Sequence, residues 1–336
     1  MLGRVGYEYS HNRILRNGSD FLVVMSINST KREFSEELPA AILDRRRLPD
    51  TQFDLLWDSI FLEKDIKDQL INQAVVGMTL RANGLGREVI PTHGVVLLIG
   101  PPGTGKTSLA RGLASRIASV ISGGATFLEI EPHALTSSAM GKTQREVTKL
   151  LGSTIPEYAA AGPVVVLLDE VETLATDRQK LSMEANPIDV HRATDAVLAQ
   201  LDHLAEKYSQ LLFIATSNFE GAIDEAFLSR CDLVIQVPLP NTEARRSILK
   251  DTIEGLGKQF PAVRKLISST EFEKVVQISQ GVDGRSLRKM IASACAYKKE
   301  SAIDPGKLTA ESLLKAAEAL AATERGKEGR RFVCPQ

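Results

Sequence analysis

Residues 100–107, GPPGTGKT, have the composition and spacing of a phosphate-binding loop, G-x-x-x-x-G-K-[ST]. In such a loop the glycines let backbone N–H groups curl around a phosphate at a helix N-terminus. Lys106 would reach the β- and γ-phosphates, and the Thr107 hydroxyl would take one magnesium position. We therefore predict that ATP and Mg²⁺ bind here. The predicted nucleotide contacts of the loop are Gly100, Pro101, Pro102, Gly103, Thr104, Gly105, Lys106, Thr107 and Ser108.

Two acidic residues, Asp169 and Glu170, follow the apolar run Val164–Leu168. Asp169 is expected to hold magnesium through water. Glu170 lies one residue further on, need not bind the metal, and is expected to polarise the attacking water as a general base. The alternative for an isolated pair of this kind is two solvated acids at the end of a strand.

Two further residues have the position that hydrolysis of ATP would require. Asn218 follows the apolar run 211–215, and its side chain would hydrogen-bond the γ-phosphate or orient the water; the alternative is a turn-forming asparagine. Arg230 lies between a helical segment and the last apolar run. An arginine finger there would stabilise transition-state charge in a neighbouring subunit, which implies a ring, whereas the alternative is a surface arginine.

Five short runs rich in apolar residues are expected to form the strands that position these side chains. They are residues 95–99, 127–130, 164–168, 211–215 and 233–237. Runs without polar alternation fit strands that are covered on both faces, and strands that alternate with helices imply a mainly parallel, doubly wound α/β sheet. Functional residues then belong at the carboxyl ends of these strands. After residue 240 the strands stop, and helices are expected at 242–256, 271–280, 285–299 and 309–322.

These patterns divide the chain into four parts. We expect a short N-terminal region over residues 1–52, a large α/β domain over 53–240, a helical lid over 241–322 and a charged tail over 323–336. The basic triplet Arg45-Arg46-Arg47 is interpreted as solvated linker rather than as a targeting signal. From Trp57 onward the apolar spacing predicts a helix that leads to the first strand of the large domain.

Composition excludes several classes of protein. The chain has 336 residues with 41 basic and 42 acidic side chains, and its formal charge of −1 argues against a dedicated nucleic-acid binder. Its 3 cysteines have no metal-binding or disulfide-like spacing, so reduced thiols are expected. No apolar run approaches the length of a membrane span, and no secretory signal is recognised, so we expect a cytoplasmic protein.

The phosphate loop, acidic strand end, asparagine-tipped strand, arginine and helical lid, in this order, resemble an AAA+ ATPase. A closer resemblance, over about residues 53–300, is to the pachytene-checkpoint remodellers, also called thyroid-receptor-interacting AAA+ proteins. The segments that carry it are WDSI at 57–60, the loop region 100–109, Glu129-Ile130 with His133 and Leu135, VTK at 147–149, DEVETL at 169–174, VLAQLD at 197–202, TSN at 216–218 and GVDGRSLRKM at 281–290.

This resemblance implies a homohexameric ring that hydrolyses ATP and threads the N-terminal segment of a HORMA-domain protein through its pore, which releases that protein from its partner. Glu170 would drive hydrolysis, Asn218 would be the first sensor and Arg230 the finger acting in trans. Arg285, in the lid, would be the second sensor; its alternative is a charge on a helix surface.

The chain departs from the family pattern at two places. The family has an aromatic pair in its first pore loop, where this chain has Ala139-Met140, so a weaker or different grip on substrate is expected. Only some 50 residues precede the ATPase core, which resembles the bacterial members that act beside HORMA proteins and cyclic-nucleotide synthases in antiphage signalling. Two other functions are alternatives to remodelling of a HORMA-domain protein. One is a nucleotide-gated loader that acts on DNA, and the other is an unfoldase that serves a protease.

Overall fold

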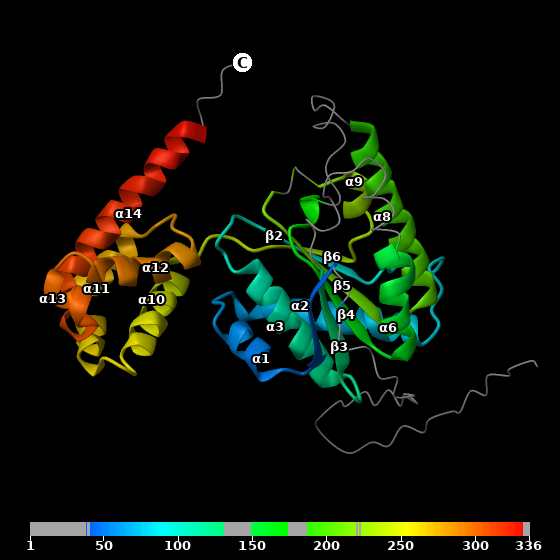
Figure 1. Cartoon of the computed structure of the whole chain (residues 1–336), viewed down its shortest axis with the longest axis horizontal. Helices are drawn as coiled ribbons and strands as arrows, with labels where there is room; N and C mark the ends of the chain where they lie inside the picture. Colours follow the sequence, from blue (N-terminus) through cyan, green and yellow to red (C-terminus); the bar gives the residue numbers. More distant parts are fainter. Residues whose placement is uncertain are drawn as a thin grey trace, which may run out of the picture.

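The apolar runs of the chain form the strands of one sheet. The computed structural model describes residues 38, 41–130, 149–173, 187–219, 221 and 223–331, without the side chains at 173, 187–194, 196 and 327–331. The six strands of the sheet lie in the order β1-β3-β4-β5-β2-β6 (Figure 1). The last five in this order are parallel, as predicted, and β1 pairs antiparallel to β3. The strands are β1 (Ile42–Leu48), β2 (Val95–Ile99), β3 (Ala125–Ile130), β4 (Val164–Leu168), β5 (Leu211–Ser217) and β6 (Leu233–Gln236).

Helices cover both faces of the sheet, which explains why the central strands are apolar on both sides. In β2, Val95, Leu97 and Ile99 face one apolar cluster, while Val96 and Leu98 face the other. α6, α8 and α9 pack on the first cluster, and α1, α2 and α3 pack on the second. These helices are α1 (Thr51–Asp58), α2 (Lys64–Ala82), α3 (Lys106–Val120), α6 (Ile155–Ala161), α8 (Pro187–Lys207) and α9 (Glu225–Leu228).

Strand β1 corrects the interpretation of the basic triplet as a linker. The three arginines lie within this edge strand, where Arg46 stacks over the Phe53 ring at 4.4 Å and pairs with Asp44 at 2.7 Å. Arg45 donates to the Tyr158 hydroxyl at 3.2 Å. The long stems of arginine cover apolar surface while their charged ends stay in water, and charged side chains are common on edge strands. The predicted N-terminal region therefore contributes a sixth strand to the sheet.

The helix predicted from Trp57 onward is broken into two. α1 ends at Asp58 and α2 begins at Lys64. Trp57 is buried against α3, whereas Ile60 lies in the segment between the helices. This interruption places residues 59–62 along a cleft that is described below.

The residues after β6 form a separate helical cluster beside the sheet (Figure 1). Its apolar core joins buried residues of α10, α11, α12 and α14, in agreement with the four predicted helices. Asn241, Ser269 and Asp283 cap the first three of these by accepting backbone N–H groups. The helical elements are α10 (Thr242–Leu256), α11 (Thr270–Ile278), α12 (Gly284–Cys295), α13 (Lys299–Ile303), α14 (Ala310–Arg331) and the 3₁₀ segments Pro261–Ser268 and Pro305–Lys307.

Helix α14 extends further than predicted. It continues through most of the charged segment assigned to a tail and ends at Arg331. Alanine, glutamate, lysine and arginine all favour helix, so a charged composition does not by itself end one. Among the helices of the described residues, none has the length and apolar character that a membrane span requires.

Candidate active site

The phosphate-loop residues join the carboxyl end of β2 to the first turn of α3. Gly103 and Gly105 have φ angles of 82° and 91°, in the left-handed region that glycine adopts without strain. No side chain caps the start of α3, where Gly105 is the N-cap residue. Thr104 instead donates to the Pro101 carbonyl at 2.9 Å and stiffens the loop. The loop thus presents a helix N-terminus, the usual binding place for a phosphate.

Lys106 is buried at the centre of the loop. Its ammonium group donates to the carbonyls of Gly100 at 2.8 Å and Pro101 at 2.9 Å, and to Oδ1 of Asn218 at 2.9 Å. Burial lowers the pKa of Lys106, an effect that the carboxylates of Glu172 and Asp169 oppose. The carbonyl and amide oxygens that hold this cation are weaker partners than the anionic oxygens of a phosphate.

The side chains of Thr107 and Asp169 are in contact beside Lys106, at the carboxyl edge of the sheet. The Thr107 hydroxyl lies 2.9 Å from Oδ1 and 3.1 Å from Oδ2 of Asp169, and the Thr216 hydroxyl also donates to Oδ1. Thr216 was not among the predicted site residues, although it stands near the end of the predicted strand at 211–215. Three oxygen-bearing side chains therefore converge, from α3, from the residue that follows β4 and from β5.

Glu170 has a φ angle of 53°, in the left-handed region that a long side chain seldom adopts. Its backbone N–H donates to the Thr216 hydroxyl at 3.1 Å. Its Oε1 accepts from Nδ2 of Asn218 at 3.3 Å, while the Asn218 backbone N–H donates to Glu172 at 3.2 Å. Strained backbone of this kind is typical of functional sites.

The helical cluster meets the phosphate loop through the start of α12. The backbone N–H of Arg285 donates to the Gly103 carbonyl at 3.2 Å. A methyl group added at Gly103 would lie 2.0 Å from a carboxylate oxygen of Asp283, so this contact is close. Asp283 also caps α12 through Ser286. The Arg285 side chain is exposed and lines the cleft beside the loop.

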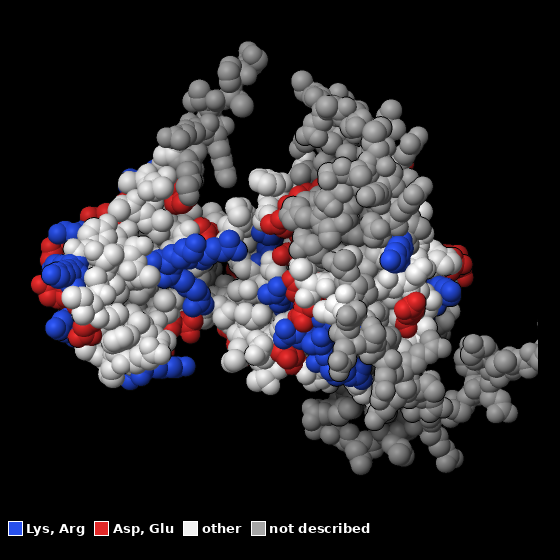
Figure 2. All heavy atoms as spheres, in the orientation of Figure 1, with Lys and Arg blue, Asp and Glu red and all other residues white. Residues whose placement is uncertain are grey.

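This cleft has a volume of about 930 Å³ and lies between the sheet and the helical cluster. In the view of Figure 2, basic side chains of the cluster extend toward the sheet, where further basic side chains lie. Ser108 lines the cleft, as do several residues that sequence reasoning missed. Apart from loop and α12 residues, the lining includes Ser59, Ile60, Phe61, Leu62, Pro238, Pro240 and Ile248. The Pro-Leu-Pro turn at residues 238–240 was a signal in the sequence, whereas the break between α1 and α2 was not. Only folding brings the two segments together.

Arg230 lies apart from these residues in the same chain. In the described part of the chain, its guanidinium donates to Asp202 at 2.7 and 3.1 Å and to the Ala226 carbonyl at 2.7 Å. Pro102 of the phosphate loop is exposed, and its side chain has no polar atom with which to make a hydrogen bond. Ala139 and Met140, the predicted pore-loop residues, lie outside the described residues.

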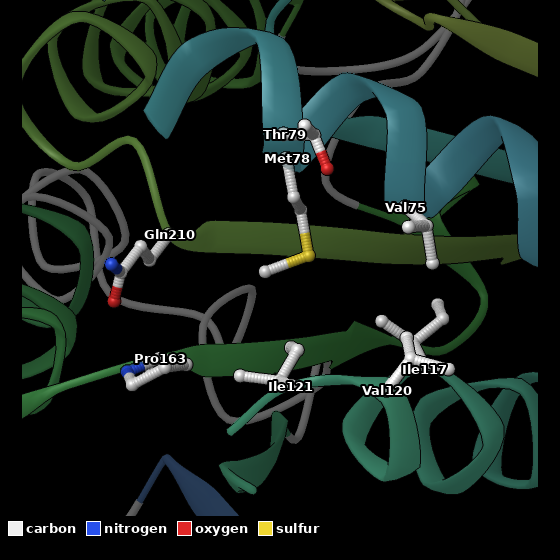
Figure 3. Close-up of a pocket in the computed structure, with 8 residues that line it drawn as sticks. All are labelled: Val75, Met78, Thr79, Ile117, Val120, Ile121, Pro163 and Gln210. Carbon is white, nitrogen blue, oxygen red and sulfur yellow. The ribbon is translucent and has the colours of Figure 1, made fainter. Parts of the chain in front are cut away.

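A second hollow, lined mainly by apolar side chains, lies at the opposite end of the sheet (Figure 3). Met78 of α2 points between Pro163 and Gln210, which come just before β4 and β5, while Val75 of α2 and Ile117 of α3 lie at the other end of the hollow. Because parallel strands run in one direction, their amino ends lie opposite the edge that carries the phosphate loop. This apolar hollow is therefore separate from the candidate active site.

Comparison with known proteins agrees with this arrangement. Residues 96–239 match the model of the ATPase family associated with various cellular activities (AAA). The chain is 57% identical over 277 residues to CD-NTase-associated protein 6 of Pseudomonas aeruginosa, covering 82% of this chain and 91% of that protein. It is 32% identical over 306 residues to the pachytene checkpoint protein 2 homologue of Danio rerio, covering 83% and 71%.

A solved structure shares the fold. In the structure of the E. coli MS115-1 HORMA:CdnC:Trip13 complex, one chain matches with a TM-score of 0.65 and 19% identity, over 83% of this chain and 95% of that one. The predicted fold class, an AAA+ core followed by a helical lid, is confirmed. The chain belongs to the AAA ATPases, in the family that includes CD-NTase-associated protein 6 and the pachytene checkpoint protein 2 homologues.

Proposed function

We propose that this ATPase forms a hexameric ring that uses ATP hydrolysis to remodel a HORMA-domain protein and release it from its partner. The observation that carries ATP hydrolysis is the set of side chains at the carboxyl edge of the sheet, and the remodelling step is inferred from relatives. Hydrogen bonds connect Lys106, Asn218 and Glu170, and through Thr216 they continue to Asp169 and Thr107. Binding of a nucleotide alone would not need an acid and an amide beyond the phosphate loop, whereas hydrolysis needs both.

The residues of the loop are proposed to bind the triphosphate of ATP. Backbone N–H groups at the start of α3 and the Lys106 ammonium would contact its phosphates, with Arg285 and the cleft beside the loop on the other side. Thr107 and Asp169 fit Mg²⁺ because they offer adjacent oxygen atoms on two rigid elements, and Mg²⁺ completes its shell with water and phosphate. When bound, the ion neutralises charge on the phosphates.

Glu170 is proposed as the general base for the attacking water. Its contact with Asn218 gives the carboxylate a defined orientation, and Asn218 also contacts Lys106. A base that is oriented by a second group, which in turn contacts the phosphate-binding lysine, is suited to respond to the presence of the γ-phosphate. The products would be ADP and phosphate.

Arg230 is proposed to act on the nucleotide of the neighbouring subunit. Its hydrogen bonds support this role, because they go to Asp202 and Ala226 and to none of the predicted nucleotide-site residues of its own chain that the structure describes. A ring then follows, because each site would be completed by the next subunit.

We propose the large domain at residues 53–240, joined by β1, as the catalytic part. Residues 241–322, with the rest of α14, are proposed as the lid.

The substrate is inferred from relatives. One relative is named for its association with a CD-NTase, and another structure holds HORMA, CdnC and Trip13 together. By analogy, the substrate here would be a HORMA-domain protein bound to a cyclic-nucleotide synthase, in cytoplasmic antiphage signalling. Ala139 and Met140 are proposed to grip the substrate in the pore.

The test compares wild type with Glu170→Gln. The substrate is a HORMA–synthase complex from the same genome. We expect wild type with ATP to release the HORMA protein. Glu170→Gln should bind ATP and form hexamers, but lose at least about a hundredfold in turnover and leave the complex intact.

Glu318→Gln, an exposed change on α14, serves as the matched control and should behave as wild type. Hexamer formation is measured by sedimentation and release by size-exclusion chromatography. A HORMA–synthase complex that persists unchanged while wild type turns over ATP would contradict the proposed substrate.

A further inference from the structure

The Arg230 side chain is held by an acid on another helix. Its Nε donates to Oδ1 of Asp202 at 3.1 Å and its Nη2 donates to Oδ2 at 2.7 Å. Asp202 belongs to α8, whereas Arg230 follows α9. The pair is partly exposed, with 23% of the Arg230 side chain and 34% of the Asp202 side chain accessible. Two-point contact on one carboxylate sets the plane of the guanidinium as well as its position.

The backbone below Arg230 is also rigid. Its N–H donates to the carbonyl of Phe227 at 3.0 Å, and Phe227 is fully buried. Two residues further on, the N–H of Asp232 donates to the Val95 carbonyl of β2 at 2.8 Å. The main chain is therefore fixed, and the long, rotatable side chain is the part whose direction Asp202 decides.

The hydrogen-bond inventory of Arg230 leaves two N–H groups for another ligand. A guanidinium carries five N–H donors. Within the described part of the chain, Nε and Nη2 use one each on Asp202, and Nη1 uses one on the Ala226 carbonyl, so three of five are engaged. One N–H of Nη1 and one of Nη2 are thus left to donate to another ligand, such as the oxygens of a phosphate.

The charge around Arg230 is not cancelled by Asp202. Arg87 also pairs with the Asp202 carboxylate at 3.3 Å and donates to its backbone carbonyl at 3.4 Å. Burial and the Arg87 cation lower the pKa of the neighbouring His93, so its imidazole is neutral at neutral pH. Two guanidinium groups thus share the Asp202 carboxylate, so this one acid does not neutralise both. The nearby Asp232 carboxylate instead accepts the backbone N–H groups of His93 and Gly94.

We infer that Asp202 is a positioning residue for the arginine finger: it holds the Nε–Nη2 edge of Arg230 so that the remaining N–H groups of Nη1 and Nη2 are presented to the nucleotide of the neighbouring subunit. This inference rests on the proposed role of Arg230 in trans. Asp202 would therefore affect hydrolysis of the nucleotide in the neighbouring subunit and not of the nucleotide that its own chain binds.

Steady-state ATPase assays on the full chain test the inference. We expect Asp202→Ala and the isosteric Asp202→Asn to lower kcat about tenfold, with KM for ATP changed less than about twofold, because a misplaced group loses rate rather than binding. Arg230→Ala should lower kcat at least about a hundredfold. The double variant should be no slower than Arg230→Ala alone.

Glu273→Gln is the matched control, because Arg246 holds Glu273 with the same two-point geometry at 2.8 and 2.9 Å on the surface of the helical cluster. It should keep wild-type kcat. If Arg230→Ala also keeps wild-type kcat, the proposed role of the finger fails. If Arg230→Ala is impaired while both Asp202 variants are as fast as wild type, or faster, the positioning inference alone is overturned.

Mixed rings separate positioning from a general effect on the fold. Asp202→Ala subunits mixed with Glu170→Gln subunits should regain turnover, because an intact finger from the second subunit completes the site of the first. Asp202→Ala mixed with Arg230→Ala should regain none, because both changes damage the same side of the boundary. Failure of Glu170→Gln subunits to rescue Asp202→Ala, while they rescue Arg230→Ala, would overturn the inference.

Discussion

At the scale of single residues, Asn218 connects the phosphate-binding lysine to the proposed base. Its Oδ1 accepts from Lys106, and its Nδ2 donates to Glu170. The two ends of one amide thus touch the lysine that is proposed to hold the phosphates and the glutamate that is proposed to activate water. If Lys106 moves toward a bound phosphate, its hydrogen bond to Asn218 changes, and the orientation of the Asn218 amide changes with it.

Replacement of Asn218 tests this connection. We expect Asn218→Ala to lower kcat about a hundredfold, because Glu170 loses its orienting donor, while ATP affinity changes only a few-fold. Asn83→Ala is the matched control, since Asn83 is an exposed asparagine whose side chain donates to the Thr79 carbonyl of α2, and it should keep wild-type turnover. The measurements are steady-state ATPase rates and nucleotide titration. Equal rates for the two variants would contradict the assignment.

Three of the predicted site residues come together at strand ends that were recognisable in the sequence. Asp169, Glu170 and Asn218 meet because the carboxyl ends of parallel strands share one edge of the sheet. Asp202 and Asp283 were not predicted as site residues. Each is an acid on or beside a helix, and only packing brings it to Arg230 or to the phosphate loop.

At the scale of elements, the position of α3 depends on one close contact. α1 crosses α3 at Gly112, where an added methyl group would lie 2.6 Å from Cβ of Trp57 and 2.8 Å from its Cα. Trp57 and Phe53 of α1 are buried in the cluster that supports α3. Since α3 begins at the phosphate loop, this packing also positions Lys106 and Thr107.

A methyl group at this crossing should destabilise the fold. We expect Gly112→Ala to lower the free energy of unfolding by about 1–3 kcal/mol, because the neighbouring atoms include backbone and cannot move away. Gly255→Ala in α10 is the matched control, since nothing lies within 4 Å of its added methyl group, and it should stabilise by about 0.5–1 kcal/mol. Guanidinium unfolding curves measure both. A Gly112→Ala protein as stable as wild type would contradict the packing argument.

The predicted elements were closest to the structure where apolar periodicity was strong. The strands at 95–99 and 164–168 and the helix at 242–256 have the predicted bounds. β1 was missed because its Asp44 and three arginines hide the strand pattern, and their stems pack only after the edge of β3 is present. The break at residues 59–63 was missed because Ile60 continues the helical spacing of α2.

At the scale of the whole molecule, the candidate nucleotide cleft is built from two parts of the fold. The sheet contributes the phosphate loop, and the helical cluster contributes Ile248, Arg285 and Arg288. Arg288 also donates to the Ser59 carbonyl at 3.2 Å, which ties the cluster to the segment before α2. A ligand in this cleft would contact both parts at once.

Removal of the Arg285 charge should therefore weaken ATP binding. We expect Arg285→Ala to raise KM for ATP about tenfold, which corresponds to about 1.4 kcal/mol. Lys289→Ala is the matched control, because Lys289 is an exposed cation on the same helix that does not line the cleft, and its KM should stay at the wild-type value. Steady-state kinetics over a range of ATP concentrations measure the effect. An equal rise of KM in both variants would indicate a general charge effect instead.

The sequence by itself determined which residues of this protein are candidates for chemistry. A phosphate loop, strand-end acids and an asparagine depend on spacing of a few residues, and the alternation of apolar runs with helices determined a parallel sheet. Tertiary structure alone decided which distant groups meet. Asp202 lies 28 positions before Arg230, Asp283 reaches Gly103, and residues 59–62 come to line the cleft. Such contacts arise from packing of helices on a sheet, which no local pattern of residue types records.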